Sequence, residues 1–271
     1  MAPQWRGLIN QGERKGKVDK QYDDSSDAIA IQTPHTRTCM KTTGYTLTAA
    51  LLLCAALPRA QAGLFNQIPS CYTASHYTLR SSPPQRLLYV LIDQAAPLGP
   101  SLQKSVIENI NHALGPGTEF VISEFSRATT HHYLRPLYTG IIESPLTARE
   151  RDHVPMNSLS GFDRCMRDQA IYALRMADTT AQRAMGAAAG GAAQANDILF
   201  SLQEVAPAIA ADPAAQKVLF LVSDGIEDSK LGNFSQGVAN PAQMVQAVRK
   251  AGLMPNFGGA RVFVLGAGVT P

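Results

Sequence analysis

The chain has 271 residues, of which 45% are hydrophobic and 17% are charged, and its formal net charge is +3. A chain of this length and composition can bury one substantial core, so one globular domain is the default expectation. The lysines and arginines are scattered along the sequence, and this pattern gives no sign of a nucleic-acid-binding surface.

Residues 40–62 have the order of features found in a secretory signal peptide. Lys41 precedes an apolar stretch at residues 47–57, and the small residues Ala60 and Ala62 follow it. The apolar stretch has about eleven residues, fewer than the roughly 20 that a membrane span needs. We therefore expect cleavage after Ala62 and a periplasmic or secreted protein with no stable membrane span after signal cleavage.

The same segment leaves two alternatives open. Cys54 could be the acylated residue of a lipoprotein, but Leu53 precedes it where that signal needs a small residue. Residues 1–39 could be a cytoplasmic tail on a retained signal anchor. Because they lack periodic apolar spacing, we instead expect a non-structural or mis-assigned extension, with translation starting at Met40.

Two cysteines, Cys71 and Cys165, remain in the expected mature chain. In an oxidising compartment such a pair is more often a disulfide than two free thiols, so we expect these two residues to be bonded. The alternative role for Cys165 is that of a nucleophile, but no suitable histidine and acidic or amide partner is recognisable around it. Residues 63–85 are expected to be a polar lead-in, tethered through Cys71.

The first strand, helix and second strand follow in close succession. Residues 86–93 (RLLYVLID) form an apolar run without strict alternation, which is typical of a buried strand. Apolar residues at spacings of three and four predict a helix over residues 100–114, and a strand is predicted over residues 118–125. A crossover of about 40 residues is right-handed, so the sheet is expected to be parallel here.

The middle of the chain adds an edge strand and two helices. Residues 131–145 have strand composition, but Pro136 cannot donate to a ladder, which predicts an antiparallel strand at the margin of the sheet. Residues 163–211 are predicted to form two helices with an Ala- and Gly-rich join at residues 186–195. Pro207 is expected to kink the second helix or end it early.

The last part of the chain completes the alternation. A strand over residues 217–224, a short helix over 241–251 and a strand over 261–265 predict an α/β fold. The expected architecture is a three-layer sandwich with a mostly parallel, doubly wound central sheet and one antiparallel edge strand. In that order the first and fourth strands are neighbours, so Asp93 and Asp224 should meet at the crevice where such sheets bind ligands.

Residues 86–271 resemble the von Willebrand factor type A (vWA) domains. The resemblance rests on VLIDQAAPL after the first strand, VLFLVSDG at the fourth, VFVLGAG at the fifth, and the edge strand. In that family two aspartates, two serines and a threonine hold a divalent cation for an acidic partner group. Asp93 matches the first aspartate and Asp224 the second. The family adds a helix and a strand after the fifth strand, so we expect a C-terminally trimmed domain, or an edge at residues 261–265 covered by a partner or the lead-in.

The metal-ion-dependent adhesion motif of that family is degenerate in this chain. Ala95 and Pro97 stand at the serine positions, and neither side chain carries an oxygen. The threonine has no clear counterpart, and Ser160 and Asp163 are only loose substitutes for it. Because Mg²⁺ needs about six oxygen ligands, the resemblance implies a fold without an intact cation site.

The alternative is a working site for Mg²⁺ or another divalent cation. Asp93 and Asp224 would be its principal ligands, and Glu227 and Asp228 would supply further oxygens. The structural explanation for the two aspartates is that Asp93 caps the following turn and Asp224 shapes an Asp-Gly turn, which are both common uses of aspartate.

Motifs of catalysis are absent from the sequence. It contains no G-x-S-x-G elbow, Walker loop, H-E-x-x-H pair or metal-spaced cysteine pairs, so we expect no catalytic residues and no cofactor. The leading hypothesis is a non-enzymatic exported protein that binds or helps assemble another envelope protein or complex. The alternative is a divalent-metal-dependent binder or hydrolase that uses Asp93 and Asp224, and a third is a purely structural domain.

Overall fold

The computed structural model describes residues 66–75, 81–128, 131–189, 196–235, 237–238 and 240–268. These residues all belong to one unit of the chain, Gln61–Pro271. The predicted extension at residues 1–39 and the predicted signal peptide at residues 40–62 lie outside the described residues, as does the start of the lead-in at residues 63–65.

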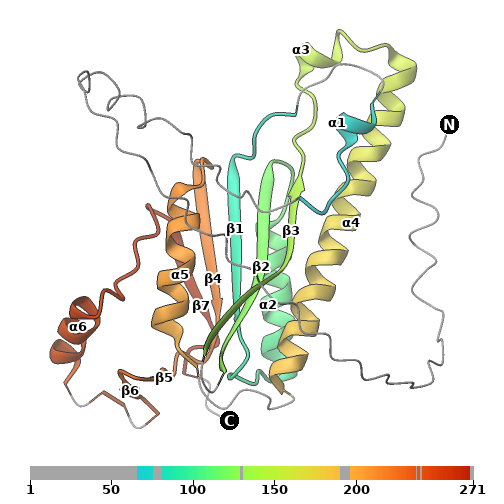
Figure 1. Cartoon of the computed structure of the whole chain (residues 1–271). Helices are drawn as coiled ribbons and strands as arrows, with labels where there is room; N and C mark the ends of the chain where they lie inside the picture. Colours follow the sequence, from blue (N-terminus) through green and yellow to red (C-terminus); the bar gives the residue numbers. More distant parts are fainter. Residues whose placement is uncertain are drawn as a thin grey trace, which may run out of the picture. The chain divides into compact units, whose positions relative to one another are not determined.

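A five-stranded sheet forms the centre of this unit (Figure 1), in the order β3-β2-β1-β4-β7. The pairs β1–β2, β1–β4 and β4–β7 are parallel, and only β2–β3 is antiparallel. The predicted α/β class, the mostly parallel sheet and the antiparallel edge strand are therefore confirmed. The bounds of the strands are Arg86–Asp93 (β1), Thr118–Ala128 (β2), His131–Ile142 (β3), Gln216–Val222 (β4) and Arg261–Leu265 (β7).

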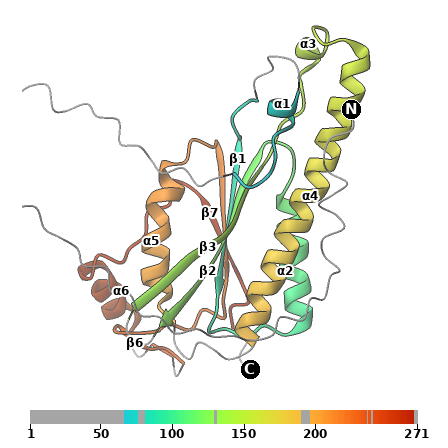
Figure 2. The same ribbon diagram turned by 45° about the vertical axis from the view of Figure 1, so that its right-hand side comes forward.

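The central strand β1 buries side chains on both of its faces, which explains why its sequence does not alternate. Helices α2 (Pro100–Ala113) and α4 (Met156–Ala189) pack on one face, and helix α5 (Ile198–Ala211) packs on the other. Figures 1 and 2 show this arrangement from two directions. The residues that β1 contributes are Leu88, Val90 and Ile92 on the first face and Leu87, Tyr89 and Leu91 on the second.

Helix α4 is longer than predicted at both ends. It begins at Met156 and runs through Gly186 to Ala189, so the predicted join at residues 186–195 is partly wrong. Alanines at a spacing of four, Ala173, Ala177 and Ala181, are fully buried against the sheet. Alanine is the best helix former, and this packing outweighs the roughly 1 kcal/mol that a glycine costs within a helix.

Helix α5 does not end early at Pro207, which was one of the two outcomes expected there. The helix continues through Pro207 and ends at Ala211, where Asp212 N–H still donates to the carbonyl of Ala208. Val205 and Ile209, on either side of the proline, are buried in the second core, and this packing holds the helix on both sides of Pro207.

The edge strand β3 contains a bulge next to Pro136, the residue from which its edge position was predicted. Tyr138 pairs with Ile122 and Pro136 with Ser123, which leaves Leu137 as an extra residue on β3. A bulge on an edge strand is one of the few places in a sheet that tolerate proline.

The disulfide between Cys71 and Cys165 is present, as predicted, with 5.8 Å between the two Cα atoms. It joins the short helix α1 (Cys71–Ala74) to the first half of α4. Cys165 is therefore not available as a nucleophile in this form of the protein.

No helix in the described ranges is long and apolar enough to cross a membrane.

Four short elements complete the described chain. Helix α6 begins where expected, with the Asn240 side chain accepting a hydrogen bond from Gln243 N–H. The bounds of these elements are Ala148–Arg151 (α3), Asp228–Ser229 (β5), Gly232–Asn233 (β6) and Pro241–Lys250 (α6).

Candidate functional site

Asp93, at the end of β1, is 1% exposed and uses both of its carboxylate oxygens. Oδ1 accepts a hydrogen bond from Ala95 N–H at 2.8 Å. Oδ2 accepts two, from the Ser223 hydroxyl at 2.7 Å and from the Asn196 amide at 2.8 Å. Three separate parts of the chain therefore meet at this one carboxylate.

The register of the sheet explains why Ser223 reaches Asp93. Ile92 of β1 is paired with Val222 of β4, so the next residue of each strand lies at the same level. The Ser223 hydroxyl also accepts a hydrogen bond from Gly225 N–H at 3.1 Å. Ser223 is fully buried, and it stands directly before Asp224 in the sequence motif.

Asn196 is the second residue of this group that the sequence did not reveal. It precedes Asp197, the N-cap of α5, and its side-chain oxygen accepts a hydrogen bond from Asp228 N–H at 3.0 Å. Asn196 thus joins the end of β1 to the start of α5 and to β5. An asparagine next to a helix cap carries no sequence signal that distinguishes it from an ordinary loop residue.

Burial raises the pKa of Asp93 to about 6. The hydrogen bonds from Ser223, Ala95 and Asn196 favour the charged carboxylate and oppose this rise, whereas the negative charge of Asp224 adds to it. Asp93 ends β1, and Asp224 stands two residues after Val222, the β4 partner of Ile92, so both aspartates lie at the same end of neighbouring strands.

Asp224 shapes the turn that follows β4. Its Oδ1 accepts a hydrogen bond from Ile226 N–H at 2.9 Å, and its backbone carbonyl accepts one from Gly268 N–H at 3.2 Å. Gly225, in this turn, has a φ of 81°, a conformation that glycine adopts without strain. One oxygen of each predicted aspartate is therefore used to hold a local turn.

Glu227 and Asp228 face other parts of the structure. Glu227 is buried, and its Oε2 accepts a hydrogen bond from Leu199 N–H at 3.1 Å, in the first turn of α5. Burial raises the pKa of Glu227, with a further contribution from the charge of Asp197. Asp228 is half-buried and pairs with Asn233 across the β5–β6 hairpin. Within the described part of the chain, no three His, Cys, Asp or Glu side chains gather as a metal-binding group would require.

The residues around Asp93 do not fit a divalent cation in this arrangement. A cation would have to displace the Asn196 amide and the Ser223 hydroxyl from Asp93 Oδ2. Ala95 and Pro97 offer no side-chain oxygen, whereas Mg²⁺ needs near-octahedral oxygen coordination. We therefore derive no chemical step through a metal ion.

Ser160 and Asp163, considered above as loose substitutes for the threonine of the vWA motif, lie far from Asp93. The Gln94 side chain, next to Asp93, donates to the carbonyl of Ala184, near the end of α4. Asp163 lies close to the start of that helix, roughly 30 Å away at about 1.5 Å per residue. Asp163 instead forms an ion pair with Arg151 at 2.7 Å, which lowers the pKa of its carboxyl group.

A second buried carboxylate, Glu143, lies at the other end of the sheet, beside the disulfide. It accepts hydrogen bonds from the Ser70 hydroxyl, from Cys71 N–H at 2.8 Å and from the Gln169 amide at 2.9 Å. The Gln169 side-chain oxygen in turn accepts a hydrogen bond from Glu143 N–H at 3.0 Å. This network fastens α1 and α4 to the end of β3.

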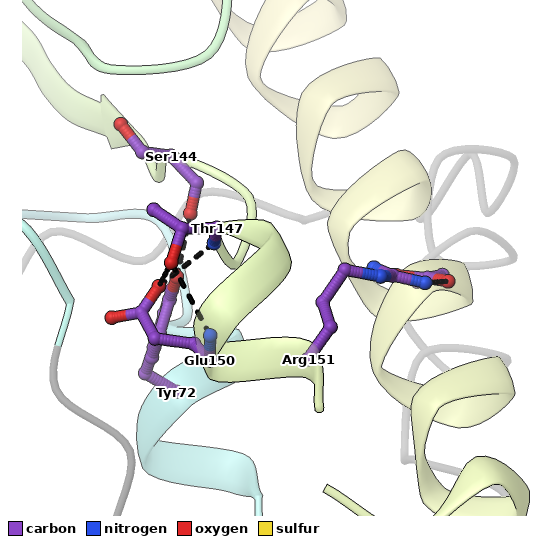
Figure 3. A network of polar contacts seen from close by, with 6 residues as sticks. Tyr72, Ser144, Thr147, Glu150 and Arg151 are labelled. Carbon is purple, nitrogen blue, oxygen red and sulfur yellow. Dashed lines mark hydrogen bonds and ion pairs between the residues drawn. The ribbon is translucent and has the colours of Figure 1, made fainter. Parts of the chain in front are cut away.

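The short helix α3 lies beside α1 and α4, near the Glu143 network, as Figure 3 shows. Thr147 and Glu150 form a reciprocal capping box in which Thr147 N–H donates to Glu150 at 2.7 Å. The Tyr72 hydroxyl donates to the carbonyl of Ser144 at 2.7 Å, and burial together with the charges of Glu150 and Glu143 raises the pKa of Tyr72 to about 12. These contacts are structural, since each group is satisfied by a neighbour in the chain.

Comparisons with known proteins leave the site to be interpreted from its own geometry: no protein-family model matches this chain, and no curated protein matches it significantly.

Proposed function

We propose that this protein is an exported, non-enzymatic component that binds another envelope protein or complex by adding a strand of the partner to β7. In this proposal its fold is a vWA-like three-layer sandwich without an intact cation site. The observation that carries the proposal is the apolar edge of the sheet at β7, whose outer side is not paired with any strand of the described residues.

Strand β7 exposes apolar side chains that the other parallel strands bury. Val262, Phe263 and Val264 are 42%, 45% and 45% exposed, whereas Val90 and Leu91 of β1 are fully buried. Several large apolar side chains in a row on one edge mark an interaction surface more often than an ordinary surface.

The backbone of β7 is oriented for pairing with another strand. The carbonyl of Leu265 accepts a hydrogen bond from Ser223 N–H, so Leu265 and Phe263 direct their peptide groups toward β4. Val262 and Val264 then direct their N–H and C=O groups away from the sheet. An extended segment of a partner can pair with these groups, as in other cases of strand addition.

The two edges of the sheet differ in their protection. The edge strand β3 carries Pro136 and a bulge, which both discourage pairing with a further strand. The sequence of β7, RVFVL, contains neither a proline nor a charged residue between Arg261 and Leu265. Strand addition is therefore expected at β7 and not at β3.

The disulfide supports the proposed export, and the hydrogen bonds on Asp93 support the proposed lack of an intact cation site. A disulfide is typical of proteins that fold in an oxidising compartment. The hydrogen bonds on Asp93 are those of a closed structural turn, which agrees with the loss of two family hydroxyls at Ala95 and Pro97.

Hydrogen exchange and substitution test the proposal together. Partner binding should protect the Val262 and Val264 amides, and it should change the Phe263 and Leu265 amides little because they already pair with β4. Val264→Lys should abolish capture of the partner by cross-linking, because a charged edge residue opposes strand pairing.

The matched control for that experiment is Val245→Lys, which places the same charge on the exposed face of α6. It should leave capture of the partner unchanged. Equal capture by the Val264→Lys protein and the wild type would reject β7 as the binding edge.

A cation-dependent binder or hydrolase is the second candidate, favoured by the position of Asp93 and Asp224 at the ends of the neighbouring strands β1 and β4. In this candidate a cation displaces the two hydrogen bonds on Asp93 Oδ2. A cation that binds the folded protein at 100 times its Kd stabilises it by about 2.7 kcal/mol. Thermal melting in millimolar Mg²⁺, Mn²⁺ or Ca²⁺ tests this candidate. A shift that Asp93→Ala abolishes would support it, and no shift would reject it.

A further inference from the structure

A hollow of about 360 Å³ lies at the beginning of the parallel strands, at the opposite end of the sheet from Asp93. It is bounded by the first residues of β1, β2 and β4 and by the last turns of α2, and it extends along β4 to Phe220 and along β7 to Leu265. This volume is at the lower end of the range for small-molecule sites, which is roughly 300–1,000 Å³.

The sheet register brings the polar lining residues together. Arg86 is paired with Thr118 on β2 and with Gln216 on β4, and directly paired residues of neighbouring strands point to the same face. Val218, two residues after Gln216 on β4, is likewise paired with Arg261 of β7. Arg86 and Arg261 therefore lie on the face that α2 covers, separated by β4.

The floor of the hollow is apolar. Phe220 and Phe263 line it and pack edge to face, with their ring centroids 5.8 Å apart. Leu88 and Leu265 extend this surface. A polar rim over an apolar floor is the usual composition of a site for a small organic molecule.

The charge of the lining has one sign. Arg86, Arg261 and the imidazole of His112 line the hollow, and none of the described residues in the lining is an aspartate or glutamate. Arg86 donates one hydrogen bond to the carbonyl of Pro116 at 2.9 Å, which leaves its other N–H groups for a ligand. In the part of the chain that the structure describes, neither arginine forms an ion pair.

Thr118 supplies an independent observation. This residue lines the hollow and is 1% exposed, and its hydroxyl oxygen is buried without a hydrogen-bond partner among the described residues. Buried hydroxyl groups in folded proteins nearly always have a partner, so this oxygen is a group that a ligand can satisfy.

We propose that this hollow binds a small organic anion, with a carboxylate or phosphate head held by Arg86 and Arg261 and an apolar body on Phe220 and Phe263. Guanidinium groups are the usual partners of both anions, because their N–H groups match the spacing of two acceptor oxygens. The hollow takes the side chains of Arg261, Phe263 and Leu265 from β7, whereas the strand addition proposed above uses the backbone of Val262 and Val264. Binding of the anion requires no partner protein.

Calorimetric titration of the full-length protein tests this site with four probes. Octanoate and octyl phosphate carry both the charge and the apolar body, and at least one of them should bind with one-to-one stoichiometry. Octanol lacks the charge and inorganic phosphate lacks the apolar body, so each should bind at least tenfold more weakly. The relative affinities of the two octyl anions decide between the carboxylate and the phosphate head.

Two substitutions then locate the site. Arg261→Gln should weaken binding roughly tenfold, which corresponds to about 1.4 kcal/mol for the loss of a charged hydrogen bond. Arg249→Gln removes the same charge from the exposed end of α6 and should not change the affinity. Thr118→Val should weaken binding without lowering the melting temperature, because no hydrogen bond among the described residues is lost.

The proposal is overturned by either of two results. In the first, neither octyl anion binds to the wild-type protein. In the second, Arg261→Gln and Arg249→Gln proteins bind the anion equally well. Because the titrations contain no partner protein, a failure here would leave the β7 proposal untouched, and the reverse also holds.

Discussion

The two ends of the central sheet have opposite characters. At the carboxyl ends of the strands, where open α/β sheets usually bind ligands, Asp93 is buried and its oxygens already accept three hydrogen bonds. At the amino ends, Arg86 and Arg261 border an open hollow with no acidic partner in its lining. The comparison shows that position in a fold does not by itself make a binding site, since the groups there must also be free to bind.

The two ends are also held together by different means. The amino end is stabilised by the disulfide and by the Glu143 network, which involves Gln169. At the carboxyl end, hydrogen bonds to the buried Asp93 carboxylate join β1, β4 and the start of α5. Four experiments, from the largest expected effect to the smallest, test this difference.

Removal of the disulfide should have the largest effect. The bond closes a loop with a sequence separation of 94 residues, for which chain entropy gives about 4 to 5 kcal/mol of stability. A Cys71→Ser, Cys165→Ser double variant should lose about this amount in urea unfolding. A loss below about 1 kcal/mol would mean that the amino end does not depend on the covalent link.

Gln169→Leu should be the next most damaging change. Gln169 is fully buried and makes three hydrogen bonds, two with Glu143 and one with the carbonyl of Pro69. Leucine would leave a buried carboxylate and two backbone groups short of partners, at a cost of about 3 kcal/mol. Gln169→Glu, which retains the shape and one acceptor, is a useful companion. Stability equal to that of the wild type in both variants would contradict the structural role of this network.

The pH dependence of stability should reveal the titration of Asp93 at the carboxyl end of the sheet. The folded-state pKa of about 6 lies above the ordinary value of 3.8, so the folded protein holds this proton more tightly than the unfolded chain does. Stability should therefore fall as the pH rises from about 4 to about 6, by about 3 kcal/mol from this group.

Asp93→Asn removes this titration and is the control for it. Comparing the two proteins isolates Asp93, because other buried groups such as Glu227 titrate in both of them. Chemical unfolding at a series of pH values gives the difference directly. If the wild type and Asp93→Asn change in parallel between pH 4 and 6, burial does not raise the Asp93 pKa as described.

The smallest effect contrasts one hydroxyl group at each end of the sheet. Ser223→Ala removes the hydroxyl that donates to Asp93 and accepts from Gly225, and should cost about 1 to 2 kcal/mol. Thr118→Val removes a hydroxyl without a described partner, and should leave stability unchanged or slightly higher. The Ser223→Ala variant should therefore melt at a lower temperature than the Thr118→Val variant. The reverse order would mean that the hollow end, and not the Asp93 end, depends on its hydroxyl group.

The sequence predicted the sheet better than the surroundings of the site. The strands at residues 86–93 and 217–224 have unbroken apolar runs, and Pro136 limits its segment to an edge, so their places follow from local rules. The pairing of Cys71 with Cys165 followed from elimination within the expected mature chain. The approach of Asp93 and Asp224 followed from the strand order.

The contacts that determine the chemistry could not be predicted in the same way. Asn196 lies 103 positions from Asp93, and Gln169 lies 26 from Glu143, so only the folded chain brings these pairs together. The hollow is lined by residues of four strands and of α2, and no local pattern in the sequence brings them together. The length of α4 was underestimated because buried alanines look like a flexible segment when their packing is unknown.

The proline bulge in β3 has a consequence for stoichiometry. A sheet with two open edges can join copies end to end without limit. Among the described residues, no strand pairs with the outer side of β7, whereas the other edge strand, β3, is interrupted by a bulge and Pro136. The strand addition proposed at β7 would therefore favour a single addition, whether the added strand comes from a different protein or from a second copy related by a two-fold axis. Leu137, the extra residue of the bulge, thus favours closed complexes over filaments.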